Sequence, residues 1–290
     1  MNSAIGIIGG SGLYEMEGLE DVHEVEVSTP FGAPSDSLVA GIYRGRRLVF
    51  LPRHGRGHRY LPAEVPYRAN VYALKSLGVE WVISISAVGS LDEELRPGDI
   101  CLPDQFIDRT WGRPGTFFGN GIAGHVALAD PICNLLQQAV WETVEAVGAR
   151  FHRGGAYLCI QGPQFSTRAE SFLYRSWGAR VIGMTNATEA RLAREAELCY
   201  TTVALVTDYD CWHETEEEVS IEAVLAVMQQ NVGTARRILQ EAVARVPAER
   251  TCPCREAARY AIMTPPELVP PDTRRSVDLL FGKYLRENTP

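Results

Sequence analysis

Short apolar runs alternate with segments of helical periodicity along most of this chain. The runs are rich in β-branched residues, and we expect strands at 5–8, 48–51, 81–87, 157–160, 181–184 and 200–206. The segments between them place apolar residues three or four positions apart, and we expect helices at 66–77, 131–147, 168–177, 189–197, 220–246 and 274–286. Such alternation favours an α/β domain with a central mixed or largely parallel sheet flanked by helices.

The chain is expected to form a single domain over residues 1–290. We find no internal repeat and no flexible linker before about Pro247. The proline-rich segment 247–271 is expected to be an irregular surface connection within that domain. The helix at 274–286 would close the fold.

Composition narrows the classes of protein to which the chain can belong. Its net charge of −8 argues against a nucleic-acid-binding protein, because such proteins carry basic faces. No run reaches the roughly 18–20 apolar residues of a membrane helix, and no signal-peptide pattern opens the sequence, so we expect a cytoplasmic protein. The seven cysteines do not follow a zinc-binding spacing. Cys252 and Cys254 flank a proline and are either a disulfide or two free surface thiols.

The candidate functional motifs all follow predicted strands. Ligands of open α/β sheets bind at the carboxyl ends of strands, so we expect these motifs to meet. Gly9-Gly10-Ser11-Gly12 is typical of a loop that binds an anion through backbone N–H groups and a hydroxyl. A plain tight turn would explain the same glycines.

Arg53 and His54 follow the strand at 48–51 directly. A planar guanidinium suits phosphate, and the imidazole adds a further polar group. A metal site built on His54 and His58 is the alternative, although the glycines around them offer no rigid face. The strand end at 84–90 contains serines and glycine, whose hydroxyl groups and small size would let a ligand approach the backbone closely. Alternatively, these are small residues that pack in the core.

Asp208 and Asp210 follow the apolar run 199–206. Alternate residues of an extended chain point the same way, so both carboxyl groups would face one side of a pocket. A nitrogen-rich ligand such as a purine would give them partners, whereas a helix cap and a solvated turn is the alternative. Phe165 would stack on a base or pack in the core, and Ser166 is expected to cap the next helix with Glu170.

Together these motifs resemble the 5′-methylthioadenosine phosphorylases, a family of trimeric purine nucleoside phosphorylases with a phosphorylase/hydrolase-like α/β fold. The resemblance covers residues 5–246. It is carried by Gly6-Ile-Ile-Gly-Gly-Ser-Gly-Leu, Thr29-Pro-Phe-Gly-Ala-Pro-Ser-Asp, Pro52-Arg-His-Gly-Arg-Gly-His, Pro97-Gly-Asp-Ile, Asp104-Gln-Phe-Ile-Asp-Arg-Thr, Gln161-Gly-Pro-Gln-Phe-Ser-Thr-Arg-Ala-Glu-Ser, Met184-Thr-Asn and Thr207-Asp-Tyr-Asp-Cys-Trp. Gln164 departs from the Arg that many relatives carry.

The resemblance implies roles for individual residues. A phosphate site would consist of Ser11, Arg53, His54, Ser86, Ala87 and Thr185, with Ala87 acting through its backbone N–H. Nucleoside contacts would come from Phe165 and Ser166 near the base, Met184 along the ribose, and Asp208 and Asp210 at the purine edge. His125 would lie near the 5′-substituent. An apolar methylthio pocket, supplied by the neighbouring subunit of a homotrimer, would include Ile221, Val224 and Leu225.

The implied reaction is phosphorolysis of 5′-methylthioadenosine to adenine and 5-methylthioribose 1-phosphate. Arg53 and His54 would position phosphate beneath the anomeric carbon. Asp210 would hold a proton at N7 of the departing purine, which requires that burial beside Asp208 raise a carboxyl pKa. Inorganic phosphate is the co-substrate, and we expect no metal and no organic cofactor. A 6-oxo purine would leave a carboxylate unpaired, so adenine is favoured.

Three other functions stay open. The chain could phosphorolyse 6-oxopurine nucleosides or 5′-methylthioinosine, which Asp210 disfavours. It could be a purine-binding sensor without catalysis, from which phosphate-dependent turnover would distinguish it. It could be a metal-dependent hydrolase built on His54 and His58, which turnover insensitive to a chelator would exclude.

Overall fold

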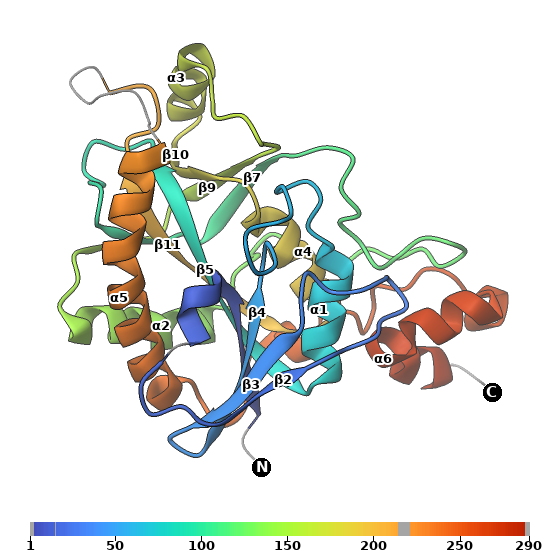
Figure 1. Ribbon diagram of the computed structural model, residues 1–290. Coiled ribbons are helices and arrows are strands. Elements are labelled where there is room, and N and C mark those ends of the chain that lie inside the picture. The colour runs from blue at the N-terminus through green and yellow to red at the C-terminus, as the bar shows by residue number, and fades with distance from the viewer. Residues whose placement is uncertain (1–2, 15, 214–220, 288–290) are drawn as a thin grey trace.

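The computed structural model describes residues 3–14, 16–213 and 221–287, except for the side chains of Ser11, Tyr14, 221–226, 228–230 and Glu287. These residues form a mixed sheet of eleven strands with helices on both faces (Figure 1). The predicted α/β architecture is therefore confirmed. No helix in the described ranges is long and apolar enough to cross a membrane.

The sheet follows the order β2-β3-β4-β1-β5-β10-β9-β7, and β11, β6 and β8 extend it from the other edge of β5. Its first strands are β1 (Ala4–Gly9), β2 (Glu20–Val25), β3 (Leu38–Tyr43), β4 (Arg46–Pro52), β5 (Val79–Ser90) and β6 (Ile100–Leu102). The later ones are β7 (Gln105–Arg109), β8 (Phe151–Arg153), β9 (Ala156–Ile160), β10 (Ala179–Gly183) and β11 (Cys199–Asp208).

Strand β5 lies at the centre of the sheet, because it pairs with three other strands, β1, β10 and β11. One edge pairs in parallel with β1 as far as Ser84, and then antiparallel with β10 at Gly89 and Ser90. The opposite edge pairs in parallel with β11 from Trp81 to Gly89. The segment 85–88 therefore lies between two partners on the first edge, and the sheet is open there.

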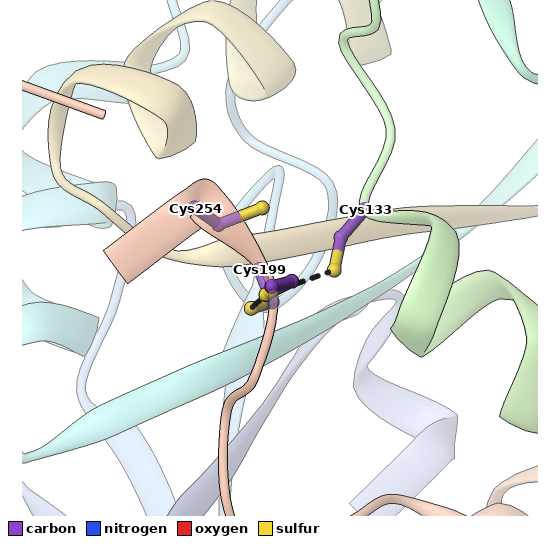
Figure 2. Close-up of side chains that lie close together, drawn as sticks. Cys133, Cys199 and Cys254 are labelled. Carbon is purple, nitrogen blue, oxygen red and sulfur yellow. Dashed lines mark hydrogen bonds between the residues drawn. The ribbon is translucent and has the colours of Figure 1, made fainter. Parts of the chain in front are cut away.

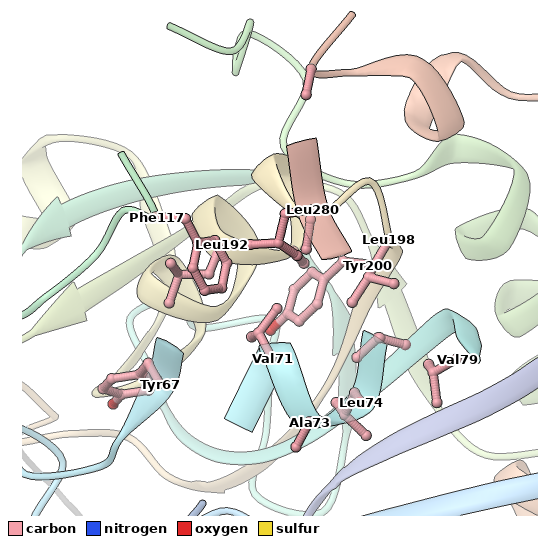
Figure 3. Packing of buried hydrophobic residues seen from close by; sticks show 14 of the residues in the cluster. Tyr67, Val71, Ala73, Leu74, Val79, Phe117, Leu192, Leu198, Tyr200 and Leu280 are labelled. Atoms are coloured by element: carbon pink, nitrogen blue, oxygen red, sulfur yellow. The ribbon is translucent and has the colours of Figure 1, made fainter. Parts of the chain in front are cut away.

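Helices cover the two faces of the sheet. On one face lie α1 (Tyr67–Ser76), α4 (Asn186–Glu195) and α6 (Pro271–Glu287), whose apolar side chains pack together in Figure 3. On the other face lie α2 (Asn134–Val147) and α5 (Ile221–Arg245). Successive side chains of a buried strand point to opposite faces of the sheet. In β1, Ile5 and Ile7 pack with the α2/α5 cluster, and Ile8 packs with the α1/α4/α6 cluster.

Several predicted boundaries differ from the structure. Helix α4 begins at Asn186 rather than 189, and α2 begins at Asn134 rather than 131. Strand β2 is exposed and polar, and β6 and β8 have three residues each, so none of these carries a strong apolar signal. The helix predicted at 168–177 is α3 (Arg168–Ser176), but its N-cap is Thr167, not Ser166, in a capping box with Glu170. Ser220, the first residue of the helix expected at 220–246, lies outside the described residues.

The segment 247–271 contains two short 3₁₀ helices, η2 (Pro253–Glu256) and η3 (Pro266–Leu268). Buried Arg46 anchors its start, because the guanidinium donates hydrogen bonds to the carbonyls of Val246 and Pro247 at the end of α5. Cys252 and Cys254 are free thiols rather than a disulfide, and Cys254 is buried rather than on the surface.

Candidate active site

A cavity of about 480 Å³ opens at the carboxyl ends of β1, β4 and β11 and beside the second half of β5. The edge of the sheet at which the motifs were predicted to meet is therefore the edge where they do meet. The predicted site residues in its lining are Arg53, His54, Ser86, Ala87, Phe165, Met184, Thr185, Asp208 and Asp210.

The gap in strand pairing along β5 supplies backbone groups to this cavity. Arg53 Nη1 donates to the Ile85 carbonyl at 2.9 Å, so the polar groups of Ile85 point to the edge that β1 has left. Residues two apart in a strand direct their backbone groups to the same edge. The geometry thus supports the prediction that the Ala87 N–H faces the cavity.

Arg53 is held in a fully buried ionic network. Its side chain pairs with Glu189 of α4, the Nε and Oε1 atoms lying 2.5 Å apart, and its Nη2 donates to Ser84 Oγ at 2.6 Å. Glu189 also accepts hydrogen bonds from the hydroxyls of Ser84 and Tyr200. Because both partners of the ion pair are almost inaccessible to solvent, the guanidinium is fixed in one orientation at the cavity wall.

His54 lies beside Arg53 as a neutral imidazole. Burial, and then the positive charge of Arg53, lowers the pKa of His54 to about 4. Its Nδ1 lies 2.8 Å from the Tyr60 carbonyl, and a carbonyl only accepts, so Nδ1 carries the proton. The other nitrogen, Nε2, is then left as an acceptor.

The geometry of His54 and His58 does not support a metal site. The two imidazole rings stack 4.3 Å apart between centroids and nearly parallel, which is a ring contact. Among the described residues, no third Cys, His, Asp or Glu joins them at a distance from which one ion could be shared.

The N-terminus of α4 closes this end of the cavity. Thr185 is its N-cap residue, is buried, and lines the cavity, while its hydroxyl donates to Asn186 Oδ1 at 3.0 Å. The first N–H groups of a helix carry partial positive charge and bind anions. Gly10 and Gly12 of the glycine turn lie in the same wall, whereas the side chain of Ser11 is outside the description.

Asp208 and Asp210 line the opposite end of the cavity in a turn, not in an extended strand. Strand β11 ends at Asp208, and Asp210 has a positive φ of 52°. Asp208 Oδ1 accepts the backbone N–H of Asp210 at 2.8 Å, and its Oδ2 accepts the Thr207 hydroxyl at 2.7 Å. The prediction that both line one pocket is confirmed, but its reason was wrong, because a side-chain turn brings them together.

The two carboxyl groups differ in their surroundings. Burial raises the pKa of Asp208, although the bonds from Thr207 and from the Asp210 N–H oppose the rise. Burial also raises the pKa of Asp210, and the charge of Asp208 raises it further against the hydroxyls of Ser171 and Ser166. Two donors hold the oxygens of Asp208, and the negative charge of Asp208 raises the pKa of Asp210.

The side walls between these two ends are apolar. Ile160, Ile182, Leu205 and Val232 line them, together with Phe165, which is 54% exposed and therefore not a core residue. Met184 lies beneath Gly162, where a side chain on that glycine would meet the Met184 sulfur. Such walls suit a planar aromatic ring and a sugar.

Some predicted residues lie elsewhere. Exposed His125 is outside the lining of this cavity and is attached by its backbone N–H to Ala261. Ser166 has a buried hydroxyl beneath Asp210 and does not line the cavity. The side chains of Ile221, Val224 and Leu225 belong to the part of α5 that the structure does not describe.

The sequence reasoning missed two supporting residues. Glu189 is the first residue of the helix expected at 189–197, but nothing in its neighbourhood signals a partner 136 positions away. Arg113 donates to the Met184 carbonyl at 2.6 Å and the Gln161 carbonyl at 2.7 Å, and so ties the ends of β10 and β9 together. Both act by holding cavity-lining segments in place.

Comparison with known proteins identifies the family to which this chain belongs. The phosphorylase superfamily model matches residues 4–244. An S-methyl-5′-thioadenosine phosphorylase from Geobacter sulfurreducens is 57% identical over 98% of this chain and 100% of its own length. One from Koribacter versatilis is 54% identical over 99% and 98%. The chain belongs to the S-methyl-5′-thioadenosine phosphorylases.

Solved structures of this family have the same fold. A methylthioadenosine phosphorylase from an Antarctic soil metagenomic library superposes with a TM-score of 0.92 at 46% identity, covering 97% of this chain and 99% of that one. The Schistosoma mansoni methylthioadenosine phosphorylase in complex with adenine gives 0.83 at 40% identity, over 89% and 96%. The resemblance identified from the motifs, and the phosphorylase-like fold expected from it, are both confirmed.

Proposed function

We propose that the chain catalyses phosphorolysis of 5′-methylthioadenosine, giving adenine and 5-methylthioribose 1-phosphate. The observation that carries the proposal is that one cavity is lined both by Arg53 and Thr185, the N-cap residue of α4, and by Asp208 and Asp210. Near-full-length identity to S-methyl-5′-thioadenosine phosphorylases supports the substrate. The enzyme is a pentosyltransferase that uses inorganic phosphate as co-substrate, and no step of the proposed mechanism uses a metal or an organic cofactor.

The phosphate would bind between Arg53, Thr185 and the backbone of Ser86 and Ala87, with Ser11 as a further donor. Because Glu189 fixes the guanidinium, phosphate is positioned without reorganisation of the site. The bare Nε2 of neutral His54 would accept the proton of a hydrogen phosphate ion. That bond would turn an unprotonated phosphate oxygen toward the anomeric carbon.

The purine would lie between Phe165 and the apolar wall, with its 6-amino and N7 edge toward the carboxyl pair. Asp208, whose oxygens are already fixed by Thr207 and Asp210, accepts from the amino group. Asp210 delivers or holds the proton at N7, so that the base leaves as a neutral species rather than an anion. Met184 would lie along the ribose.

The 5′-methylthio end would be completed by a second copy of the chain. His125 lies away from the cavity of its own chain, beside exposed Tyr260 and Met263. A homotrimer in which one subunit lends His125, or Ile221, Val224 and Leu225, to the next would close the open side near Phe165. Sedimentation equilibrium tests the assembly, and loss of 5′-methylthioadenosine affinity in His125→Ala tests the shared contact.

The reaction itself is tested by release of free base from 5′-methylthioadenosine, adenosine and 5′-methylthioinosine, each with and without phosphate. Fast adenine release from the first substrate, only when phosphate is present, is expected. Preference for the inosine analogue would favour a 6-oxopurine phosphorylase. Base release without phosphate would favour a hydrolase, and no release at all would favour a purine sensor.

A further inference from the structure

Four cysteine side chains from three distant segments meet beneath the sheet. Cys133 comes from the start of α2, Cys199 from the start of β11, and Cys252 and Cys254 from the C-terminal segment around η2. Their sulfur atoms all lie within 4.8 Å of one another. Figure 2 shows Cys133, Cys199 and Cys254 converging on one space. The spacing of cysteines along the sequence gave no sign of this cluster.

The distances within the cluster fit ligands around one ion. The sulfur of Cys252 lies 3.3 Å from that of Cys199 and 3.6 Å from that of Cys133. A disulfide would bring one pair to about 2.0 Å. Four sulfurs at about 2.3 Å from a central zinc ion lie about 3.8 Å apart at the corners of a tetrahedron. The four thiols therefore need only small shifts to form such a shell.

Two features bring positive charge close to the cluster. Cys133 is the N-cap residue of α2, so its sulfur lies at the positive end of a helix of fourteen residues. The guanidinium of Arg194 approaches Cys254, with Nη1 3.7 Å from the sulfur. A shell of four thiolates around a divalent ion carries two negative charges, and these two features oppose that charge.

The cluster is also preorganised. The backbone N–H of Cys133 donates to the Tyr200 carbonyl at 2.9 Å, which fixes the start of α2 against the start of β11. Cys133, Cys199 and Cys254 are buried, and only Cys252 is partly exposed, which gives an ion a route of entry. None of the four lines the active-site cavity. A metal bound here would be structural.

We propose that Cys133, Cys199, Cys252 and Cys254 bind one thiophilic divalent cation, of the zinc type, in tetrahedral geometry. The ion fastens the segment 247–271 to the core at a point where that segment has little regular structure. It thereby holds the chain that leads to α6, which packs on the opposite face of the sheet.

The test is metal binding by the full-length protein, prepared with reductant, loaded with zinc chloride and dialysed. About one zinc ion per chain is expected, and cobalt chloride should give the visible absorption of a tetrahedral thiolate site. Cys254→Ser should weaken zinc binding at least about tenfold. Cys101→Ala, which alters a buried cysteine outside the cluster, should leave binding unchanged.

A second readout separates a structural ion from a catalytic one. Removal of the metal by a chelator should lower Tm while leaving turnover at temperatures well below Tm unchanged. If Cys254→Ser does not fold, zinc binding by Cys252→Ser, which alters the partly exposed cysteine, and by the wild-type protein still tests the proposal. Reduced wild-type protein that takes up no zinc would overturn the proposal. So would a mass two or four hydrogens low that shows the thiols paired, or wild-type affinity in both variants.

Discussion

The buried ion pair between Arg53 and Glu189 leads to a prediction in which stability and phosphate binding are coupled. In Glu189→Gln the side chain keeps its shape but loses its charge, so Arg53, only 5% exposed, loses its counter-ion. Breaking one partner of such a pair costs about 3–5 kcal/mol of unfolding free energy. At roughly 2–4 °C per kcal/mol for a chain of this size or slightly smaller, Tm should fall by about 10 °C.

Phosphate should then stabilise the variant more than it stabilises the wild type. In the wild type, Glu189 already neutralises Arg53, whereas in the variant a bound phosphate becomes the counter-ion of the buried guanidinium. Ligand stabilisation grows with the ratio of ligand concentration to Kd, so a tighter Kd appears directly as a larger Tm increase. Thermal unfolding followed by tryptophan fluorescence, with and without phosphate, measures both effects.

Glu195→Gln is the matched control for this experiment. Glu195 is also buried and also lies on α4, but its carboxylate accepts from Phe117 N–H and the Thr116 hydroxyl and does not contact Arg53. We expect a smaller loss of stability and no change in the phosphate effect. Equal stability of Glu189→Gln and wild type, or equal stabilisation of both by phosphate, would refute the reasoning.

Three further predictions follow from the same geometry. Asp210→Asn should lower kcat for 5′-methylthioadenosine by roughly 10²–10³, while Asp208→Asn should mainly raise KM; the reverse pattern in steady-state kinetics would exchange the two roles. Since the pKa of His54 falls from 6.5 to about 4 on folding, the unfolded chain binds a proton between those pH values that the folded chain does not, so the stability of the wild type should fall by up to about 3 kcal/mol from pH 6.5 to 4. His54→Gln should lack that loss, and the raised pKa values of Asp208 and Asp210, which act in the opposite direction, cancel in the comparison of the two urea titrations. In Gly183→Ala the new Cβ would lie 1.9 Å from the Tyr157 hydroxyl, so the unfolding free energy should fall by about 1–3 kcal/mol, and an unchanged urea midpoint would show that Tyr157 can move.

The sequence was most informative where local pattern and tertiary environment agree. Strands β1, β5 and β11 are buried on both faces, so their apolar β-branched runs were recognisable without knowledge of their neighbours. Strand β2 is an exposed edge strand with charged residues, and its pairing with β3 comes from the sheet rather than from its own composition. The first turn of α4 begins with Asn186, whose side chain is buried and hydrogen-bonded to Tyr157, Ser84 and Thr202, and this polar start resembled a loop.

Many of the residues that line the cavity were predictable, but their internal bonding was not. Residues at strand ends could be grouped because parallel strands end at one edge of a sheet. The turn at Asp210 could not, since it depends on a positive φ that non-glycine residues adopt only under local constraint. Partners such as Glu189, and the assembly of cysteines from three segments, require the fold, because separations of this length leave no periodic trace in a sequence.

The unpaired stretch of β5 between its pairing with β1 and its pairing with β10 affects how the reacting groups are spaced. In the proposed mechanism Ala87 binds phosphate, and Gly89 lies against the Asp208 carboxylate and the Asp210 Cβ. Under that mechanism, two residues of one extended strand, about 7 Å of chain, would set the separation between nucleophile and leaving group. This spacing is determined by the covalent geometry of the strand and not by side-chain contacts. A single inserted residue between these positions would leave every binding side chain present and yet misalign the two halves of the reaction.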